Sequence, residues 1–262
     1  MSTYILSTSP QAETPYYIKN ISQNIYSIEE LCFYIFHNLY LMDETIMNED
    51  LCLWIETELK MEALARTLTK VISLPFTIKK FVYPIFATTG YYSYEELKEF
   101  AGQVKRFEEE TDLMRRKMRA DTLMENKLYV NAIKVYKGIV KRLDLQKDSP
   151  FFAGEVYHNI GCAFSRLFHT EDALHYFAKA NDALHTQKSL MTYLYAYYLA
   201  RTPIEYQSKL EEMGVDAATR DELQKSISEA IQDISEPEAP SEMEETLKRL
   251  TNEYQKSTGV SQ

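Results

Sequence analysis

Apolar residues recur every three or four positions along most of this 262-residue chain, which is the spacing of one face of an α-helix. The chain holds 7 glycines and 8 prolines, too few for the many tight turns of a β-sandwich or a barrel. We therefore expect an all-α protein built from long helices with few breaks. Residues 1–25 differ, because short apolar stretches alternate there with polar residues and proline, and they predict extended chain or loop.

Two copies of one capping signal predict helix starts near residues 27 and 93. Ser27 is followed by Glu30, and Ser93 by Glu96. The serine oxygen can accept a hydrogen bond from a free N–H of the first turn, while the glutamate reaches back to the chain before the helix. Asn48 is a third candidate cap. The helices predicted in this half of the chain run from 27 to about 40, from 48 to 59, from 64 to 71 and from 93 to about 126.

Two places in this half interrupt the helical pattern. The apolar stretch 76–88 contains Pro84, so it fits either one kinked helix or two short pieces, and Gly90 ends it. The charged stretch 93–126 is too long for one ordinary helix, and Gly102 or Thr111 is expected to mark a break.

The most informative stretch runs from residue 157 to residue 180. It places small residues where two antiparallel helices would approach and large rings where they would fill the space between them. The residues in this pattern are Tyr157, Ile160, Gly161, Phe164, Ala173, Phe177 and Ala180. The stretch resembles one tetratricopeptide repeat, a helical hairpin that cannot bury its apolar face alone and must stack on neighbours. Ser149-Pro150 is expected to start its first helix, and Thr170 to cap its second.

Weaker copies flank this stretch. Upstream, at a distance of 41 residues, the corresponding positions are Ala120, Leu123, Ala132 and Tyr136. Arg116 and Arg119 stand there where large apolar residues are usual in the family. Downstream, Leu194 and Tyr198 fit, Tyr195 takes the place of the small residue, and Thr202-Pro203 starts a second helix that ends at Gly214. The resemblance covers residues 112–214.

The resemblance implies a short superhelical array of helical hairpins, whose first helices line a groove that binds proteins or peptides. The groove candidates at the matching positions are Lys117, Asp121, His158, Asn159, Cys162 and Arg166. One subgroup of the family clamps a C-terminal carboxylate with Lys and Asn, and here Lys117 and Asn159 agree with that pattern. Asp121, Ser189 and Tyr193 depart from it, and an Asp would repel a carboxylate. Alternatively, the charged candidates are ordinary surface residues and Cys162 is part of the packing.

The chain is thus expected to hold an extended N-terminus, two helical regions and an acidic helical tail. The boundaries are 1–25, 26–110, 111–214 and 215–262. In the tail, a helix over 221–234 and an acidic linker precede a last helix that starts after Ser241. That last helix has one narrow apolar stripe, formed by Met243, Leu247, Leu250 and Tyr254. It can fold back as a cap, dock on a partner or occupy the chain's own groove.

The acidic charge of the chain argues against two classes of partner, nucleic acids and anionic membranes. The net charge is −10, and residues 203–262 hold 14 acidic and 6 basic residues, a net −8. A nucleic-acid binder needs a basic stripe, and docking on anionic membranes needs basic residues, so we expect neither partner. Cys32, Cys52 and Cys162 are odd in number and widely spaced, which indicates no disulfide framework or zinc site. With no signal-peptide pattern and no membrane-length apolar run, a cytoplasmic protein is expected.

The sequence offers no catalytic constellation. His158 and Cys162 lie four residues apart, a spacing that can hold a soft metal, but no third ligand is evident. Phosphate-binding loops, nucleophile elbows and zinc-protease signatures are also missing, so we expect neither a cofactor nor a metal. The function predicted is a non-catalytic adaptor or scaffold that holds a protein or peptide in a helical groove. The alternatives are a regulator that senses a peptide and switches conformation, and an enzyme with an unrecognised helical active site.

Overall fold

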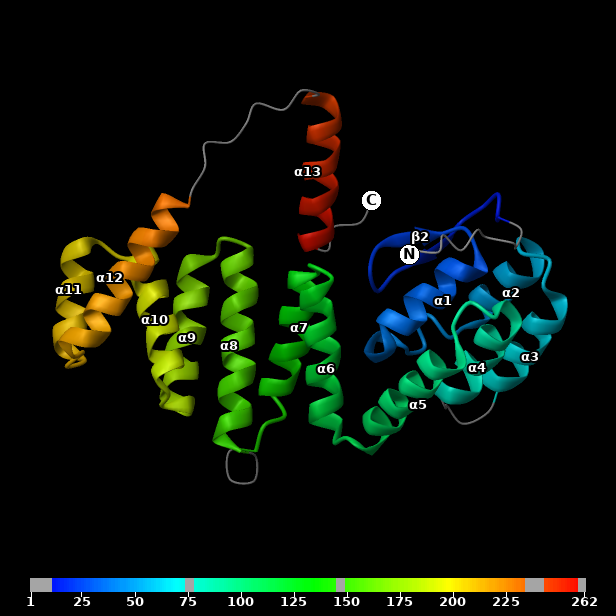
Figure 1. Ribbon diagram of the computed structural model, residues 1–262, viewed down its shortest axis with the longest axis horizontal. Coiled ribbons are helices and arrows are strands. Elements are labelled where there is room, and N and C mark those ends of the chain that lie inside the picture. The colour runs from blue at the N-terminus through cyan, green and yellow to red at the C-terminus, as the bar shows by residue number, and fades with distance from the viewer. Residues whose placement is uncertain (1–10, 74–77, 145–148, 234–242, 259–262) are drawn as a thin grey trace. The chain divides into compact units, whose positions relative to one another are not determined.

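The computed structural model describes residues 11–73, 78–144, 149–233 and 243–258. Thirteen α-helices, one short 3-10 helix and a two-stranded sheet make up this described part, so the predicted all-α class is confirmed (Figure 1). The chain divides into two compact units, Met1–Thr122 and Leu123–Gln262. The division falls inside α6 (Asp112–Glu125), so this one helix contributes residues to both units.

The first unit begins with a β-hairpin and continues as helices. Its elements are β1 (Tyr16–Ile18), β2 (Gln23–Ile25), α1 (Ile28–His37), the 3-10 helix η1 (Leu39–Leu41), α2 (Glu49–Thr57), α3 (Glu62–Ile72), α4 (Ile78–Thr89) and α5 (Tyr94–Glu109). The two strands pair antiparallel, with Tyr16 opposite Ile25. The Trp54 indole N–H donates to the Thr14 carbonyl at 2.8 Å, which attaches the N-terminal segment to α2.

The predicted caps of this unit are confirmed. Ser27 and Asn48 accept from the backbone N–H groups of Glu30 and Leu51, at 3.2 and 2.8 Å. Ser93 forms a full capping box with its glutamate at the start of α5. Each cap satisfies an N–H that has no partner within its own helix, which fixes where the helix begins.

The structure also resolves the two interruptions. Residues 78–89 form one helix with Pro84 inside it, and Gly90 follows that helix with a φ of 57°. Gly102 lies within α5, so it is not the break. The break is at Thr111, whose hydroxyl accepts from the Met114 N–H at 3.2 Å and so starts α6.

Aromatic rings join three helices of the first unit. Phe36 of α1 stacks on Phe100 of α5, with centroids 5.4 Å apart, and on Tyr92 at 4.1 Å. Phe86 of α4 meets Phe100 edge-on at 5.3 Å. Offset and edge-on ring pairs stabilise a core beyond the area they bury, so this cluster holds α1, α4 and α5 in place.

The second unit is a series of helices joined by short turns. Its helices are α7 (Tyr129–Val140), α8 (Pro150–Arg166), α9 (Thr170–Leu184), α10 (Gln187–Ala200), α11 (Pro203–Glu212), α12 (Ala217–Gln232) and α13 (Met243–Thr258). Figure 1 shows α8, α9 and α10 side by side, and α9 packs against both of the others. The predicted starts at Ser149-Pro150 and Thr202-Pro203 are confirmed, because Ser149 and Thr202 each cap their helix.

One turn geometry recurs at an interval of 41 residues. After α6, the Leu128 N–H donates to the Leu123 carbonyl at 2.8 Å, and after α8 the His169 N–H donates to the Phe164 carbonyl at 3.0 Å. A third turn of this kind follows α11, where the Val215 N–H donates to the Leu210 carbonyl at 3.0 Å. The 41-residue spacing of the two copies in the sequence is therefore repeated in their backbone hydrogen bonds.

This turn corrects two predicted helix starts. Thr170 does not cap α9; it is the first helical residue, and His169 occupies the cap position without a side-chain hydrogen bond. The turn is closed by backbone bonds, because Phe168 has a φ of 59°, which lets the chain reverse within three residues. Helix α12 begins at Ala217 rather than near Asp221, because the Asp216 carboxylate accepts from the Thr219 N–H at 3.0 Å.

The last helix lies beyond residues 234–242, so its expected cap, Ser241, lies outside the described residues. Helix α13 contacts α7. Leu247, Leu250 and Tyr254 of its apolar stripe are all at least half exposed.

Small residues allow α8 and α9 to approach closely, as the sequence predicts. A Cβ placed on Gly161 would lie 2.7 Å from the Phe177 ring, and one on Gly154 would lie 2.5 Å from the Leu184 side chain. Both distances are far below ordinary contact. The rings and branched chains of α9 therefore occupy space that only a glycine on α8 leaves open.

Replacing Gly161 should therefore destabilise the second unit. We expect Gly161→Ala to lower the free energy of unfolding by about 1–3 kcal/mol, because the buried Phe177 ring must move away from the new methyl group. The matched control is Gly138→Ala in α7, where the nearest atom to the new Cβ is an arginine nitrogen at 3.5 Å.

The control should be neutral or stabilising by up to about 1 kcal/mol, because alanine favours helix over glycine. Urea unfolding followed by far-UV circular dichroism compares the two variants. Equal unfolding midpoints would contradict the close contact.

Candidate functional site

Three of the predicted groove residues lie on one face of α8, and α10 adds a fourth residue to it. His158, Cys162 and Arg166 are spaced four residues apart, so they follow one another along one side of the helix. The Cys162 Sγ lies 3.5 Å from the His158 Nε2. Lys188, in the first turn of α10, is close enough for its charge to act on both the imidazole and the thiol. We call these four residues the α8–α10 face.

The environment keeps the two central groups of this face uncharged. Burial lowers the pKa of His158, and the charge of Lys188 lowers it further, against the opposing effect of Glu155. Burial raises the pKa of the Cys162 thiol, although Arg166 and Lys188 counteract the rise. At neutral pH the face thus presents a neutral imidazole and a protonated thiol beside two exposed cations. A thiol of this kind is a poor nucleophile, so the arrangement suits recognition better than chemistry.

The other three predicted groove residues make contacts elsewhere. The Asn159 side-chain amide donates to the Tyr136 hydroxyl at 3.2 Å, a bond that links α8 to α7. Lys117 and Asp121 both lie on α6, where they form an ion pair at 3.0 Å. The Lys117 side chain is 14% exposed, so less of it is available to a partner than of an ordinary surface lysine. Both α6 residues belong to the first unit, and the other four candidates belong to the second.

Within the described residues we searched for clusters of metal ligands and for membrane-spanning helices. There, three or more His, Cys, Asp or Glu side chains are nowhere close enough together to hold a metal ion. The pair His158 and Cys162 is not joined by a further such ligand in this part of the chain. None of the described helices combines the length and the apolar character needed to cross a membrane.

Comparisons with known proteins give no neighbour from which a role could be carried over. No family model matches the sequence, and it matches no curated protein and no solved structure. Function must therefore be argued from the residues themselves.

A second feature, which the sequence did not predict, is a cleft in the first unit with a volume of about 480 Å³. It lies where the chain after α1, the start of α4, the end of α5 and the first turns of α6 meet. Its lining residues are Tyr40, Met42, Asp43, Ile78, Phe107, Glu108, Arg115, Arg116 and Arg119. We call this the arginine cleft.

The three arginines of the cleft have different partners. Arg119 forms an ion pair with Asp43. Arg116 pairs with Asp112 of its own helix at 2.8 Å. Arg115 donates to the backbone carbonyl of Glu108 at 3.5 Å, the outer limit of a hydrogen bond.

Asp43 is held ionised beside Arg119. Burial pushes the pKa of its carboxyl group upward, but hydrogen bonds from Thr45 and the charge of Arg119 outweigh burial and bring the pKa below its ordinary value of 3.8. The ion pair is therefore intact at neutral pH, and it fixes Arg119 against the chain that follows α1.

A signal for the cleft was present in the sequence. In the sequence, Arg116 and Arg119 stand where the expected repeat pattern has large apolar residues. The first turns of α6 belong to the first unit, where these positions line the cleft. Lys188 was not predicted, because Ser189 rather than Lys188 stands at the position that matches the repeat pattern, and Ser189 is 3% exposed.

The Asp43–Arg119 pair should make stability depend on pH. Because folding lowers the pKa of Asp43, the unfolded chain binds more protons, and the stabilisation is lost as the pH falls through and below about 3.8. At neutral pH, Asp43→Asn should cost about 1–3 kcal/mol, because a half-buried arginine loses its charged partner.

The stability gap between wild type and Asp43→Asn should then close in acid. Asp112→Asn is the matched control, because Asp112 also pairs with an arginine but is 61% exposed, and its gap should be small at every pH. Urea unfolding at a series of pH values measures both gaps. A gap for Asp43→Asn that stays constant down to pH about 2 would contradict the assignment.

Proposed function

We propose that this chain is a non-catalytic adaptor whose second unit binds an extended segment of another protein. In this proposal, α6 to α11 form a tetratricopeptide-like array of stacked hairpins. Two observations support the array: the turn that recurs at an interval of 41 residues, and the packing of Phe177 against Gly161. A surface shaped by neighbouring helices can hold an extended chain along its length.

The binding surface proposed is the α8–α10 face, and its juxtaposed residues are the observation that carries the proposal. His158 and Cys162 are half-buried, neutral and able to form hydrogen bonds, while Arg166 and Lys188 are exposed cations at their sides. Partly buried neutral groups favour close contact with a partner, and flanking charges set its orientation and speed its approach.

The chemistry of the face indicates the kind of segment it would take. Two exposed cations favour a segment with at least one acidic group. The imidazole of His158 lies 5.5 Å from the buried Phe177 ring, so its surroundings are apolar on that side. An apolar side chain beside an acidic one therefore fits the face best. The remaining groove candidates, Lys117, Asp121 and Asn159, would contribute to the framework of the array rather than to direct contact.

A displayed library of random peptides, with the full-length chain as bait, tests this proposal. We expect enrichment of peptides that combine an acidic and an apolar residue. The double variant Arg166→Glu/Lys188→Glu should weaken the selected peptides at least about tenfold, because each changed charge then repels the acidic group. A bound peptide should also slow alkylation of Cys162.

The matched control is Lys134→Glu/Lys141→Glu, which reverses two exposed charges, one on α7 and one at its C-cap, and changes no residue of the face. It should retain binding within about twofold. The proposal fails if the library yields no binder, or if the selected peptides bind both double variants and the wild type equally.

A further inference from the structure

The arginine cleft plays no part in the proposed adaptor function, so we consider it separately. It lies wholly in the first unit, apart from the α8–α10 face. Its lining combines three arginines with two acidic residues, Asp43 and Glu108. Asp43 pairs with Arg119. Asp112, next to the lining, pairs with Arg116. The third arginine, Arg115, donates to a neutral carbonyl, and a cation of this kind in a concave place attracts anions.

Arg115 is the group best placed to meet such an anion. Its two neighbouring arginines are each paired with a carboxylate, whereas the partner of its Nη1 is the neutral carbonyl of Glu108 at 3.5 Å. A guanidinium group carries five N–H donors in a fixed fork that matches a carboxylate. A carboxylate that entered the cleft could therefore form two parallel hydrogen bonds with Arg115 and replace the weak one to the carbonyl.

The lining of the cleft also has apolar side chains. The rings of Tyr40 and Phe107 lie 5.2 Å apart at a tilted angle, and Met42 and Ile78 are each 4% exposed. Met42 and Ile78 are thus already covered. The partly exposed rings of Tyr40 and Phe107 gain free energy when an apolar group covers them. The volume of about 480 Å³ lies in the range of small-molecule sites, which are mostly apolar with a few polar groups that fix orientation.

The charges of the cleft also restrict the charge that a ligand can carry. The single charge of Arg115 matches a monoanion, while a phosphate dianion would exceed it and leave the aromatic rings uncovered. Asp43 and Glu108 would repel a polyanion such as a nucleic acid. The chemistry that remains is a single carboxylate on an apolar body.

We propose that the arginine cleft is a second binding site, which takes a monocarboxylate with an aromatic or aliphatic group. Arg115 binds the carboxylate, and Tyr40 and Phe107 pack against the apolar group. The Asp43–Arg119 pair holds the wall of the cleft in place. Two sources supply this chemistry, a free organic acid and the C-terminal residue of a peptide.

Isothermal titration calorimetry on the full-length chain tests the site with matched probes. N-acetylphenylalanine carries both required groups, its amide lacks the charge, and N-acetylglycine lacks the ring. We expect the first probe to bind at least about tenfold more tightly than either of the others. A tetrapeptide that ends in phenylalanine, compared with its C-terminal amide, shows whether a peptide end is accepted, and inorganic phosphate tests for a general anion site.

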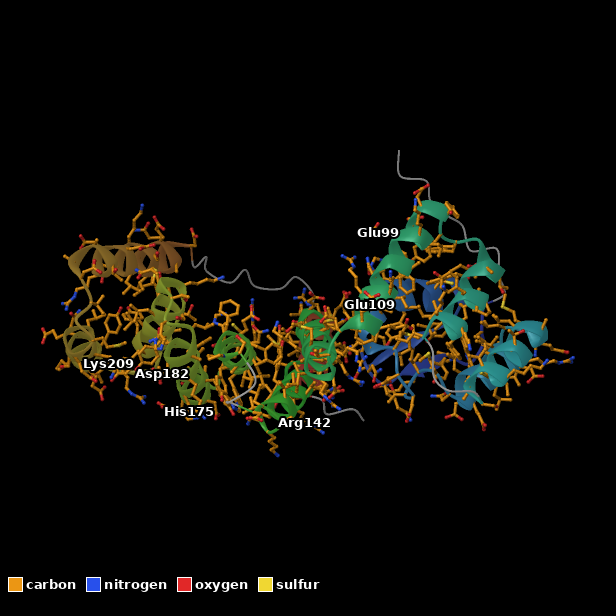
Figure 2. The ribbon with its side chains drawn as sticks, turned by 90° about the horizontal axis from the view of Figure 1, so that it is seen from below. Glu99, Glu109, Arg142, His175, Asp182 and Lys209 are labelled. Atoms are coloured by element: carbon orange, nitrogen blue, oxygen red, sulfur yellow. The ribbon has the colours of Figure 1, made fainter. Side chains whose placement is uncertain are left out.

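Arg115→Gln should weaken N-acetylphenylalanine at least about tenfold. Its matched control is Arg142→Gln in the second unit; Arg142 is labelled in Figure 2. The Arg142 guanidinium also donates to a backbone carbonyl, that of Gly138 at 3.0 Å. The control should bind like the wild type. Arg115 is partly exposed, so both variants should fold, and circular dichroism checks this.

The outcomes separate this proposal from the adaptor function. If only N-acetylphenylalanine binds tightly, the ligand is a small organic acid. If the tetrapeptide acid binds more tightly, the ligand is the C-terminus of a peptide. Either result supports the site. Equal binding of acid and amide, phosphate binding as tight as that of the acid, an unaffected Arg115→Gln variant, or no heat of binding up to millimolar concentrations overturns it. None of these results depends on Arg166 or Lys188, so the α8–α10 face is tested independently.

Discussion

The contact between Gly161 and the Phe177 ring is the constraint on which the second unit depends. A side chain on Gly161 would overlap the ring, so a hydrogen at this position sets how closely α8 and α9 approach. The same ring lies against His158 on the neighbouring turn. The packing that joins the two helices therefore also fixes the imidazole, and with it the α8–α10 face. Phe177 thus contributes both to the packing of α8 on α9 and to the surroundings of His158 in the proposed binding face.

Helix α6 shows how one element serves two different environments. Its first turns carry Arg115, Arg116 and Arg119, which line a cleft of the first unit. Its last turn carries Leu123, whose carbonyl accepts the hydrogen bond that closes the first copy of the recurring turn. The first turns of α6 therefore contribute to the cleft, and its last turn contributes to the turn that precedes α7.

Much of the fold followed from the sequence because it depends on local interactions. Ser93 and Asn48 satisfy free N–H groups within three residues of themselves, so their helix starts were correctly predicted. The prediction that Thr170 caps α9 was wrong. The turn before α9 depends on a positive φ at Phe168, and phenylalanine rarely adopts such a φ, so the sequence does not indicate this turn. The arginine cleft joins residues up to 79 positions apart, from Tyr40 to Arg119, and no local pattern brings them together.

The candidate site was predictable only along one helix. The spacing of His158, Cys162 and Arg166 placed them on one side of α8, but the contribution of Lys188 depends on how α10 packs. An NMR titration of His158 therefore tests the account most directly. We predict a pKa below the ordinary 6.5 that rises toward it in Lys188→Met and stays unchanged in Lys179→Met, a lysine exposed on α9. A His158 pKa at or above 6.5, or one that Lys188→Met leaves unmoved, would contradict the shared face of α8 and α10.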